Sequence, residues 1–175
     1  MSGVLESLRV LAAVLDDLCV PFALIGGHAV NAWLEPRVTA DVDVTIEANA
    51  ALLAGIKTRL LSLGYRVARE HGVSLPSGPD FIRWVSCDGA LVVEMQVAKT
   101  HLQSRVIERA VRRDGSIPVA TPEDLLVLKL IANRPKDQAD ISGLVALSAM
   151  DWPYVQQAAE EWGVLELLGQ KRFRS

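Results

Sequence analysis

Gly26-Gly27, followed by Arg37-Val-Thr-Ala-Asp41-Val-Asp43, is the stretch of this chain that decides its fold. The segment before it, Pro21-Phe-Ala-Leu-Ile25, is apolar and bounded by Pro and Gly, which predicts a short buried strand. The two glycines allow a sharp turn and a close approach of the backbone to a ligand, because they have no Cβ. A short helix over 28–34 would follow, and the N–H groups at its start would attract phosphate. The glycines could equally serve only the turn from strand to helix.

The acid pair Asp41 and Asp43 lies on the next predicted strand. The run Asp41-Val-Asp-Val-Thr-Ile46 alternates polar and apolar residues, so both carboxylates share one face. They would lie roughly 6.5–7 Å apart along the strand. Two carboxylates so close repel each other unless a cation lies between them. The pair therefore suggests a divalent metal such as Mg²⁺, which binds few carboxylates and completes its shell with water and phosphate. Solvated acids, or a cap for the following helix, are the alternatives.

A third carboxylate, Glu94, stands in the middle of the apolar run Ala90-Leu-Val-Val-Glu-Met-Gln-Val97. Strand interiors disfavour Glu, and a buried carboxylate without a partner is costly. A metal shared with Asp41 and Asp43 would supply that partner. The alternative is an edge strand that exposes Glu94 to solvent.

A lysine follows on a helix that the sequence marks clearly. Thr121-Pro-Glu-Asp has the residues of a helix start, and the run 125–132 after it is apolar nearly all round apart from Lys129. Lys129 must reach solvent or meet an anion, and a triphosphate would satisfy it. Asp137 and Asp140 lie three residues apart on the next predicted helix, where one could pair with Lys129 or Arg134. A helix cap at Asp137 with a structural salt bridge is the alternative.

Together these segments resemble the nucleotidyltransferase superfamily, which has the DNA polymerase β-like fold. The glycine turn and Asp41-Val-Asp43 match its first motif, and Glu94 matches its third carboxylate. The run from Thr121 to Ile141 resembles the C-terminal helices of a small prokaryotic branch that includes AbiEii-like toxin nucleotidyltransferases. Lincosamide and aminoglycoside nucleotidyltransferases are more distant kin. The resemblance covers roughly residues 20–145 and is specific for the superfamily, much less so for a substrate.

The resemblance implies a role for each matching residue. The three carboxylates would be catalytic and would bind one or two Mg²⁺ ions, with Glu94 also activating the attacking hydroxyl as general base. The residues expected at the NTP are Gly26, Gly27, Arg37, Thr39, Lys129 and Asp140. Among these, the glycines would cradle the triphosphate, Lys129 would contact phosphates, and Asp140 would orient a basic group or the ribose.

The implied reaction is Mg²⁺-dependent transfer of NMP from an NTP to a hydroxyl of tRNA, of a protein or of a small molecule. The chain would then be a phosphorus-containing group transferase, and it could be the toxin of a toxin–antitoxin pair with an antitoxin protein as partner. Many relatives have Gly-Ser where this chain has Gly26-Gly27, so one hydroxyl contact to phosphate is missing. That departure leaves open a non-catalytic nucleotide-binding or protein-interaction module with the same fold.

Composition fits an ordinary globular domain. Of 175 residues, 50% are apolar, which is enough for a core, and the net charge of −3 is not that of a general nucleic-acid binder. The basic cluster Arg105, Arg109, Arg112 and Arg113 could hold RNA phosphates, or could be a solvated face. Cys19 and Cys87 have no disulfide or zinc spacing, which fits a reducing cytoplasm, and no apolar run is long enough to span a membrane.

We therefore expect an α+β fold in which a mixed β-sheet nucleotidyltransferase core, residues 1–120, is flanked by helices. A C-terminal helical segment, residues 121–175, would pack on that core as part of one compact unit. The predicted helices are 3–18, 28–34, 49–63, 100–110, 122–133, 136–148 and 152–162. The predicted strands are 22–25, 41–47, 65–69, 81–87, 90–98 and 117–119.

Overall fold

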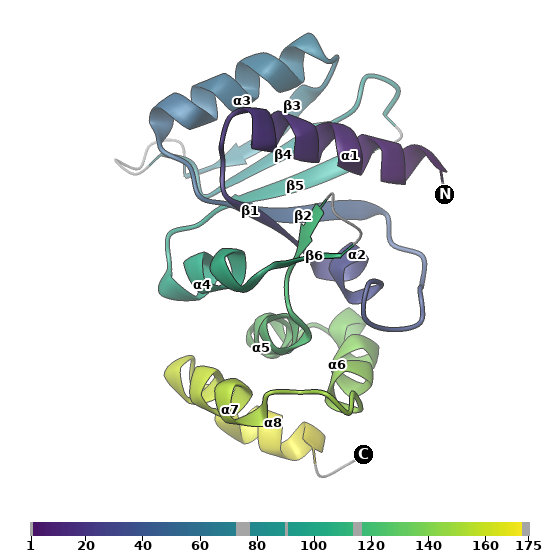
Figure 1. Ribbon diagram of the computed structural model, residues 1–175, viewed down its shortest axis with the longest axis vertical. Coiled ribbons are helices and arrows are strands. Elements are labelled where there is room, and N and C mark those ends of the chain that lie inside the picture. The colour runs from purple at the N-terminus through teal and green to yellow at the C-terminus, as the bar shows by residue number, and fades with distance from the viewer. Residues whose placement is uncertain (1, 73–77, 90, 114–116, 173–175) are drawn as a thin grey trace. The chain divides into compact units, whose positions relative to one another are not determined.

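The computed structural model describes residues 2–72, 78–89, 91–113 and 117–172. The chain divides into two compact units, one made of Met1–His28 and Val38–Ala120, the other of Ala29–Arg37 and Thr121–Ser175. The first unit is built on a mixed seven-stranded sheet, and the second is helical (Figure 1). This is the predicted α+β fold.

The sheet of the first unit has the strand order β3-β4-β5-β2-β1-β7-β6. Its members are β1 (Phe22–Ile25), β2 (Asp41–Ile46), β3 (Arg66–His71), β4 (Phe81–Val85), β5 (Val92–Val97), β6 (Val111–Arg113) and β7 (Ile117–Val119). The pairs β2–β5 and β1–β7 are parallel, and the other neighbours are antiparallel. Because β5 lies between β4 and β2, the carboxylate that it carries is not on an edge strand.

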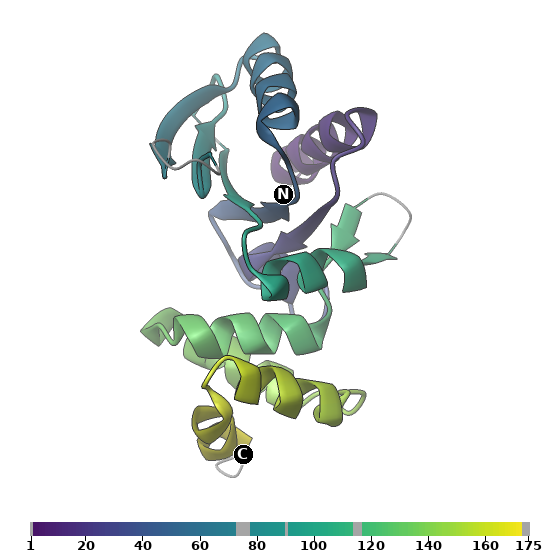
Figure 2. The same ribbon diagram turned by 90° about the vertical axis from the view of Figure 1, so that its left-hand side faces the viewer.

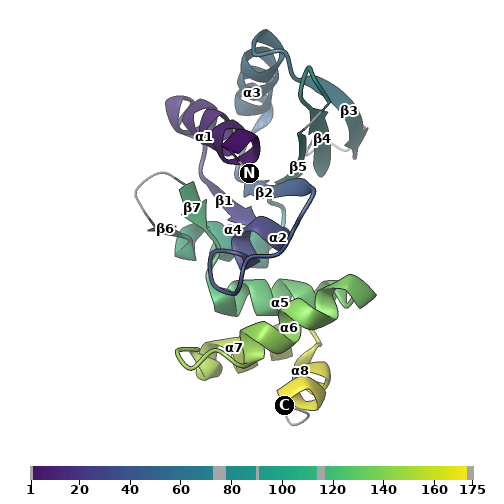
Figure 3. The ribbon, with the colours of Figure 1, turned by 90° about the vertical axis from the view of Figure 1, so that its right-hand side faces the viewer.

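One face of this sheet is the core of the first unit. Alternate residues of the central strands are fully buried on it, among them Val42, Val44, Ile82, Trp84 and Met95. Helices α1 (Ser2–Asp17) and α3 (Ala50–Ser62) lie side by side along this face (Figures 1 and 3). Asp41, Asp43 and Glu94, which alternate with these buried residues, point to the opposite face and are only partly buried.

Local signals explain where the helices of this unit begin. The Asn49 side chain accepts a hydrogen bond from the Leu52 N–H at 3.0 Å, which caps α3. Thr100 and Gln103 form a capping box at the start of α4 (His101–Arg109), a helix that contacts β1 and β2. Each cap satisfies N–H groups that have no partner inside the helix.

The second unit gathers α5 (Pro122–Ala132), the 3₁₀ turn η1 (Pro135–Asp137), α6 (Gln138–Val145), α7 (Trp152–Glu161) and α8 (Leu165–Arg172) (Figure 2). Helix α5 is buried along most of its length, as its nearly continuous apolar sequence predicts. The first turn of α5 is joined to the start of α7 by two hydrogen bonds. The Tyr154 hydroxyl donates to Asp124, and the Asp151 N–H donates to Glu123 at 3.1 Å.

Some predicted elements differ from the structure. The helix predicted over 28–34 is wrong, since α2 covers only Gly26–Val30. The side-chain amide of Asn31 explains why α2 ends at Val30. Its Nδ2 donates to the Arg37 carbonyl at 2.7 Å and its Oδ1 accepts from the Arg37 N–H at 3.1 Å, so the chain folds into turns instead.

Further along the chain, the helix predicted over 136–148 is η1 followed by α6, and β3 continues to His71, opposite Phe81. Two short elements, β6 and α8, were not predicted, because the first has three residues and the second buries only Leu168. Ala90, included in a predicted strand, lies outside the described residues. Within those residues, no helix is long and apolar enough to cross a membrane.

Candidate active site

The three predicted carboxylates gather on the partly open face of the sheet. Parallel pairing of β2 with β5 places Asp43 directly opposite Glu94, and Asp41 opposite Val92. Asp41 and Asp43, two residues apart on β2, point to the same face as Glu94. Side-chain exposure is 39% for Asp41 and 25% for Glu94, so neither is sealed from solvent. Tertiary structure thus brings together acids that lie more than fifty positions apart in the sequence.

An arginine that the sequence analysis did not select joins this group. Arg83 on β4 pairs across the sheet with Glu94. Its guanidinium lies 3.2 Å from the Glu94 carboxylate and 3.9 Å from that of Asp41. Arg83 is the only polar residue in the strand Phe-Ile-Arg-Trp-Val, but only the strand register shows that it faces the acids.

Gly26 explains how the backbone approaches the acids. Antiparallel pairing of β1 with β2 places Ile25 opposite Asp43, so the next residue, Gly26, lies directly against the Asp43 side chain. A Cβ at Gly26 would stand 2.0 Å from Asp43 Oδ2, and the residue has a φ of 66°. Both the contact and the left-handed backbone require glycine here. Gly27, the next residue, is buried in α2.

The donor chemistry of this face fits Mg²⁺, which prefers oxygen ligands and needs only one or two carboxylates from the protein. Within the described residues, however, no three acidic, histidine or cysteine side chains converge closely enough to hold a metal ion. Arg83 instead supplies positive charge to Asp41 and Glu94. Glu94 would have to leave Arg83, or share it, in order to join Asp41 and Asp43 on a metal.

Lys129 belongs to a network of charges in the second unit. The residue is 5% exposed. Its ammonium group lies 2.9 Å from the carboxylate of Asp137 and 2.7 Å from that of Asp140. Arg134 also binds Asp137, through Nε at 2.7 Å. Arg37 holds Asp140 with two hydrogen bonds, from Nε at 2.8 Å and from Nη2 at 2.6 Å. Asp137 makes no side-chain cap, so the alternative of a helix cap is wrong, and the predicted pairing with Lys129 or Arg134 is present with both cations.

The network controls the ionisation of its acids. Burial alone would raise the pKa of Asp137, but hydrogen bonds from Arg134 and Lys129 hold this pKa at about 2. The pKa of Asp140 is likewise below its usual value, because hydrogen bonds from Arg37 and Lys129 outweigh the effect of burial. The hydrogen bond to Asp140 in turn raises the pKa of Arg37. Both acids therefore carry full negative charge at neutral pH, and Lys129 is held between them.

The residues predicted from the sequence thus fall into two groups. Gly26, Gly27, Thr39 and the three carboxylates belong to the first unit, and Arg37, Lys129 and Asp140 to the second. Thr39 is half-buried in the loop before β2. The contact of Lys129 or Thr39 with an NTP remains a prediction.

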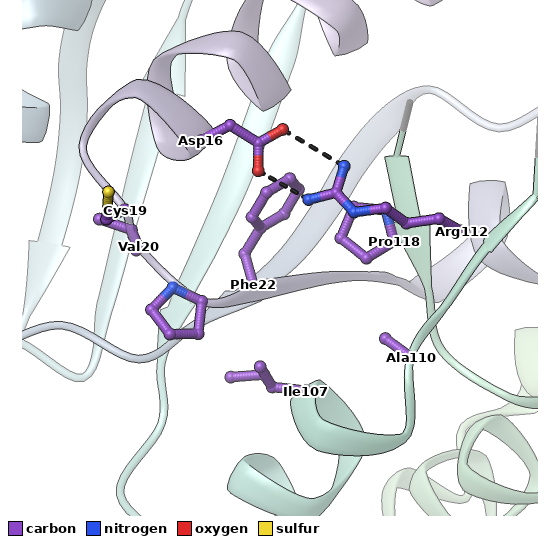
Figure 4. A pocket seen from close by; sticks show the side chains of 9 residues that line it. Asp16, Cys19, Val20, Phe22, Ile107, Ala110, Arg112 and Pro118 are labelled. Carbon is purple, nitrogen blue, oxygen red and sulfur yellow. Dashed lines mark hydrogen bonds and ion pairs between the residues drawn. The ribbon is translucent and has the colours of Figure 1, made fainter. Parts of the chain in front are cut away.

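A hollow elsewhere in the first unit contains none of the residues predicted to bind the NTP or a metal. It has a volume of about 470 Å³ and is lined mainly by apolar side chains, including Phe22, Ile107 and Pro118 (Figure 4). Arg112, from the predicted basic cluster, lies at this hollow with its guanidinium 2.6 Å from Asp16. Arg112 is therefore engaged in an ion pair, and the side chain of Arg113 lies outside the described part of the chain. Cys19 and Cys87 are both free thiols.

Comparison with known proteins shows which family the chain belongs to. The family described as "Nucleotidyl transferase AbiEii toxin, Type IV TA system" matches residues 9–148. The chain belongs to this AbiEii nucleotidyltransferase family. No curated protein matches the chain.

Solved structures share the fold of this AbiEii family member. An antigenic nucleotidyltransferase-like protein from Paracoccidioides brasiliensis is 23% identical, with a TM-score of 0.60 over 95% of this chain and 87% of that one. The antibiotic-resistance factor ANT(2'')-Ia is 18% identical, with a TM-score of 0.56 over 99% and 95%. The Thermotoga maritima CCA-adding enzyme, solved with tRNA, is 16% identical, with a TM-score of 0.53 over 98% of this chain and 46% of its own. At sequence identities this low, these structures show a shared fold and no more.

Replacing Gly26 by Ala tests the close contact with Asp43. We expect Gly26→Ala to lower the free energy of unfolding by more than the roughly 1–2 kcal/mol of left-handed strain alone, since the new Cβ would also push Asp43 aside. Gly89→Ala is the matched control, because Gly89 has a φ of 73° but nothing within 4 Å of its Cβ position. Denaturant unfolding measures both. Equal losses in the two variants would show that the Asp43 contact is unimportant for stability.

Acid should weaken the network around Asp137. Its folded pKa of about 2 lies below the roughly 3.9 of an unfolded Asp. Its contribution, about 2 kcal/mol, is therefore complete above about pH 5 and is lost as the pH falls towards 2. Denaturant unfolding between pH 7 and pH 2 should show a smaller acid-dependent loss in Asp137→Asn than in the wild type. Asp16→Asn, at an exposed ion pair, is the control. A wild-type pH dependence that survives in Asp137→Asn would contradict the assignment.

Proposed function

We propose that this protein is a Mg²⁺-dependent enzyme that transfers NMP from an NTP to a hydroxyl group of an acceptor. The observation that carries the proposal is the gathering of Asp41, Asp43 and Glu94 on one sheet face beside the close turn at Gly26. Membership of the AbiEii nucleotidyltransferase family supports the same reaction class. The fold that the chain shares with ANT(2'')-Ia and a CCA-adding enzyme agrees with it.

The reaction assigns each acid a task. The acceptor oxygen attacks the α-phosphorus, the bond from that phosphorus to the bridging oxygen of the β-phosphate breaks, and pyrophosphate leaves. Glu94 would take the proton of the attacking hydroxyl, and Asp41 and Asp43 would be the residues that hold Mg²⁺. When bound, Mg²⁺ would neutralise charge that develops on the phosphates and lower the pKa of the attacking hydroxyl.

Within the second unit, Lys129 and Arg37 are the cations that we expect to contact phosphate. Lys129 is already bound by two carboxylates, so a phosphate contact would need one of them to give way. Arg37 retains 43% side-chain exposure while Asp140 fixes one edge of its guanidinium. We therefore assign Asp140 the task of orienting basic groups, and Arg37 a contact with phosphate. Within the first unit, Gly26, Gly27 and Thr39 are the residues that we expect at the NTP.

A nucleotide-binding module without turnover is the second candidate function. The position of Arg83 favours it, because a built-in cation at Asp41 and Glu94 reduces the need for a metal. The glycine at position 27, where many relatives have serine, points the same way. The presence of all three carboxylates favours the enzyme.

The biological role that we propose is that of a toxin restrained by an antitoxin protein in the cytoplasm. It rests on the family, which is described as the toxin of a type IV toxin–antitoxin system. Induced synthesis in a bacterial host should then arrest growth in the wild type and not in Asp41→Ala/Asp43→Ala. Equal growth with both proteins would count against the toxin role while leaving the reaction class open.

Loss of the acid pair should abolish transfer. Purified wild type, incubated with Mg²⁺, each α-labelled NTP and either total RNA or a metabolite extract, should release pyrophosphate and label an acceptor. Asp41→Ala/Asp43→Ala should lose at least about a hundredfold in rate, because metal and triphosphate lose their shared ligands. Asp16→Asn/Asp17→Asn, which removes two exposed acids elsewhere, is the control for charge. Nucleotide binding by the wild type without label in any fraction would favour the non-catalytic module.

Removing Arg83 should strengthen metal binding. If its guanidinium competes with Mg²⁺ for Asp41 and Glu94, Arg83→Gln should bind the ion about two- to fivefold more tightly, as expected for a half-exposed ion pair. Arg59→Gln removes a similarly exposed arginine from α3 and should leave the affinity unchanged. Isothermal titration measures both. Weaker binding by Arg83→Gln would mean that Arg83 positions the acids instead of competing for them.

A further inference from the structure

Arg37 is held in the second unit at two places, its side chain and its backbone. The guanidinium donates two hydrogen bonds to the Asp140 carboxylate, from Nε at 2.8 Å and from Nη2 at 2.6 Å. The side-chain amide of Asn31 binds the backbone of the same residue. It donates to the Arg37 carbonyl at 2.7 Å and accepts from the Arg37 N–H at 3.1 Å. These contacts fix both the point from which the guanidinium extends and the direction of one of its edges.

Helix α6 supports the segment that Asn31 closes. A Cβ at Gly143 would stand 2.6 Å from Leu34 Cδ1, so Leu34 packs directly against the helix at this glycine. Asp140 and Gly143 are three positions apart on α6 and therefore share a face. Glycine is a poor residue for a helix interior, and the close approach of Leu34 accounts for its presence here. One face of α6 thus carries both the contact with Leu34 and the acid that holds Arg37.

The end of this segment depends on hydrogen bonds for its position. Residues 35–37 are exposed, so burial of apolar surface contributes little to where Arg37 lies. An Asn amide is suited to the task, because it both donates and accepts and can satisfy the N–H and the C=O of a single residue. A hydrogen bond to any backbone group of the segment would close the loop. The two bonds of Asn31 are instead made to the residue that carries the guanidinium.

The charge network to which Arg37 belongs contains more cations than acids. Its three cations and two acids give a net charge of +1 over Arg37, Lys129, Arg134, Asp137 and Asp140. The two acids and Lys129 are buried, whereas the side chains of Arg37 and Arg134 are 43% and 55% exposed. The excess positive charge is therefore accessible at the arginines. An anion can bind Arg37 there without breaking the buried pairs of Lys129.

We propose that Asn31 is a positioning residue that sets the Arg37 guanidinium to receive a phosphate of the NTP. This inference rests on the proposed function, in which Arg37 contacts phosphate, and adds the residue that acts through Arg37. A guanidinium whose plane is already fixed loses less conformational freedom when phosphate binds. Without the Asn31 amide, the exposed segment would have more conformations, and only the fraction with the guanidinium in place would bind phosphate well.

A double-mutant cycle of Asn31→Ala and Arg37→Gln tests this role. Each protein is titrated with each of the four NTPs and Mg²⁺ by isothermal titration, without an acceptor. We expect Arg37→Gln to bind the preferred NTP roughly tenfold more weakly, since a charge-assisted hydrogen bond is lost. Asn31→Ala should bind about three- to fivefold more weakly. In the double variant, the loss of Asn31 should lower the affinity no further, because the guanidinium that it positions is absent.

Denaturant unfolding of the same proteins separates positioning from a purely structural role. Asn31→Ala should lower stability equally with Arg37 or Gln at position 37, because the amide binds backbone groups that both residues have. Asn49→Ala is the matched control, since it removes an exposed Asn that accepts a backbone N–H at the start of α3. It should lower stability and leave NTP affinity unchanged. If Asn31→Ala does not fold, Asn31→Gln, which displaces the amide by one methylene, takes its place in the cycle.

The outcomes distinguish this inference from the proposed function. Unchanged NTP affinity in Asn31→Ala, or the same loss of affinity with Arg37 and with Gln at position 37, would overturn the inference. The reaction would survive if the wild type still released pyrophosphate in the presence of an acceptor. The expected cycle without any transfer by the wild type would support the positioning role and overturn the reaction. Absence of NTP binding by the wild type would overturn both.

Discussion

The register between β1, β2 and β5 is the constraint on which the candidate site depends. It sets Ile25 opposite Asp43 and Asp43 opposite Glu94, so one line across the sheet fixes the turn at Gly26 and two of the three acids. A shift of one residue would turn Asp41 and Asp43 into the core and expose Val42 and Val44. Burial of that apolar face under α1 and α3 therefore holds the acids in place.

The same physical requirement shapes both units, namely that acids drawn out of water need cations. In the first unit Arg83 meets Glu94 and Asp41. In the second, Lys129, Arg37 and Arg134 surround two acids that are almost fully buried. The acids of the two units differ in how deeply they are buried. The acids of the second unit are almost fully buried and their pKa values are lowered by the surrounding cations, whereas the acids of the first unit stay partly exposed. Exposed acids can exchange their partner for a metal and a substrate, so the first group is better suited to chemistry.

Membership of the AbiEii family indicates the class of reaction, and the sheet separates acidic from basic residues on one face. Acids at the centre and bases at the outer strand make the face electrically polar. A fold does not by itself decide which substrate a protein takes, so the acceptor depends on side chains and not on the shared fold.

The sequence by itself determined the fold class and the positions of most strands and helices, and it placed Asp41 and Asp43 on one face of a strand. Alternation in Asp41-Val-Asp-Val, the Gly-Gly turn and the cap at Thr121 are local signals, and local physics is enough to read them. The sequence did not determine the end of α2, where Asn31 closes a loop onto Arg37. It offered Asp137 and Asp140 as partners of Lys129, but not that Lys129 pairs with both. Only the tertiary structure decided that Arg83 meets Glu94, that Gly26 must make room for Asp43, and that Arg66 and Arg69 share a face with the acids. These contacts join strands that are distant in sequence. They are set by strand register, which no single segment encodes.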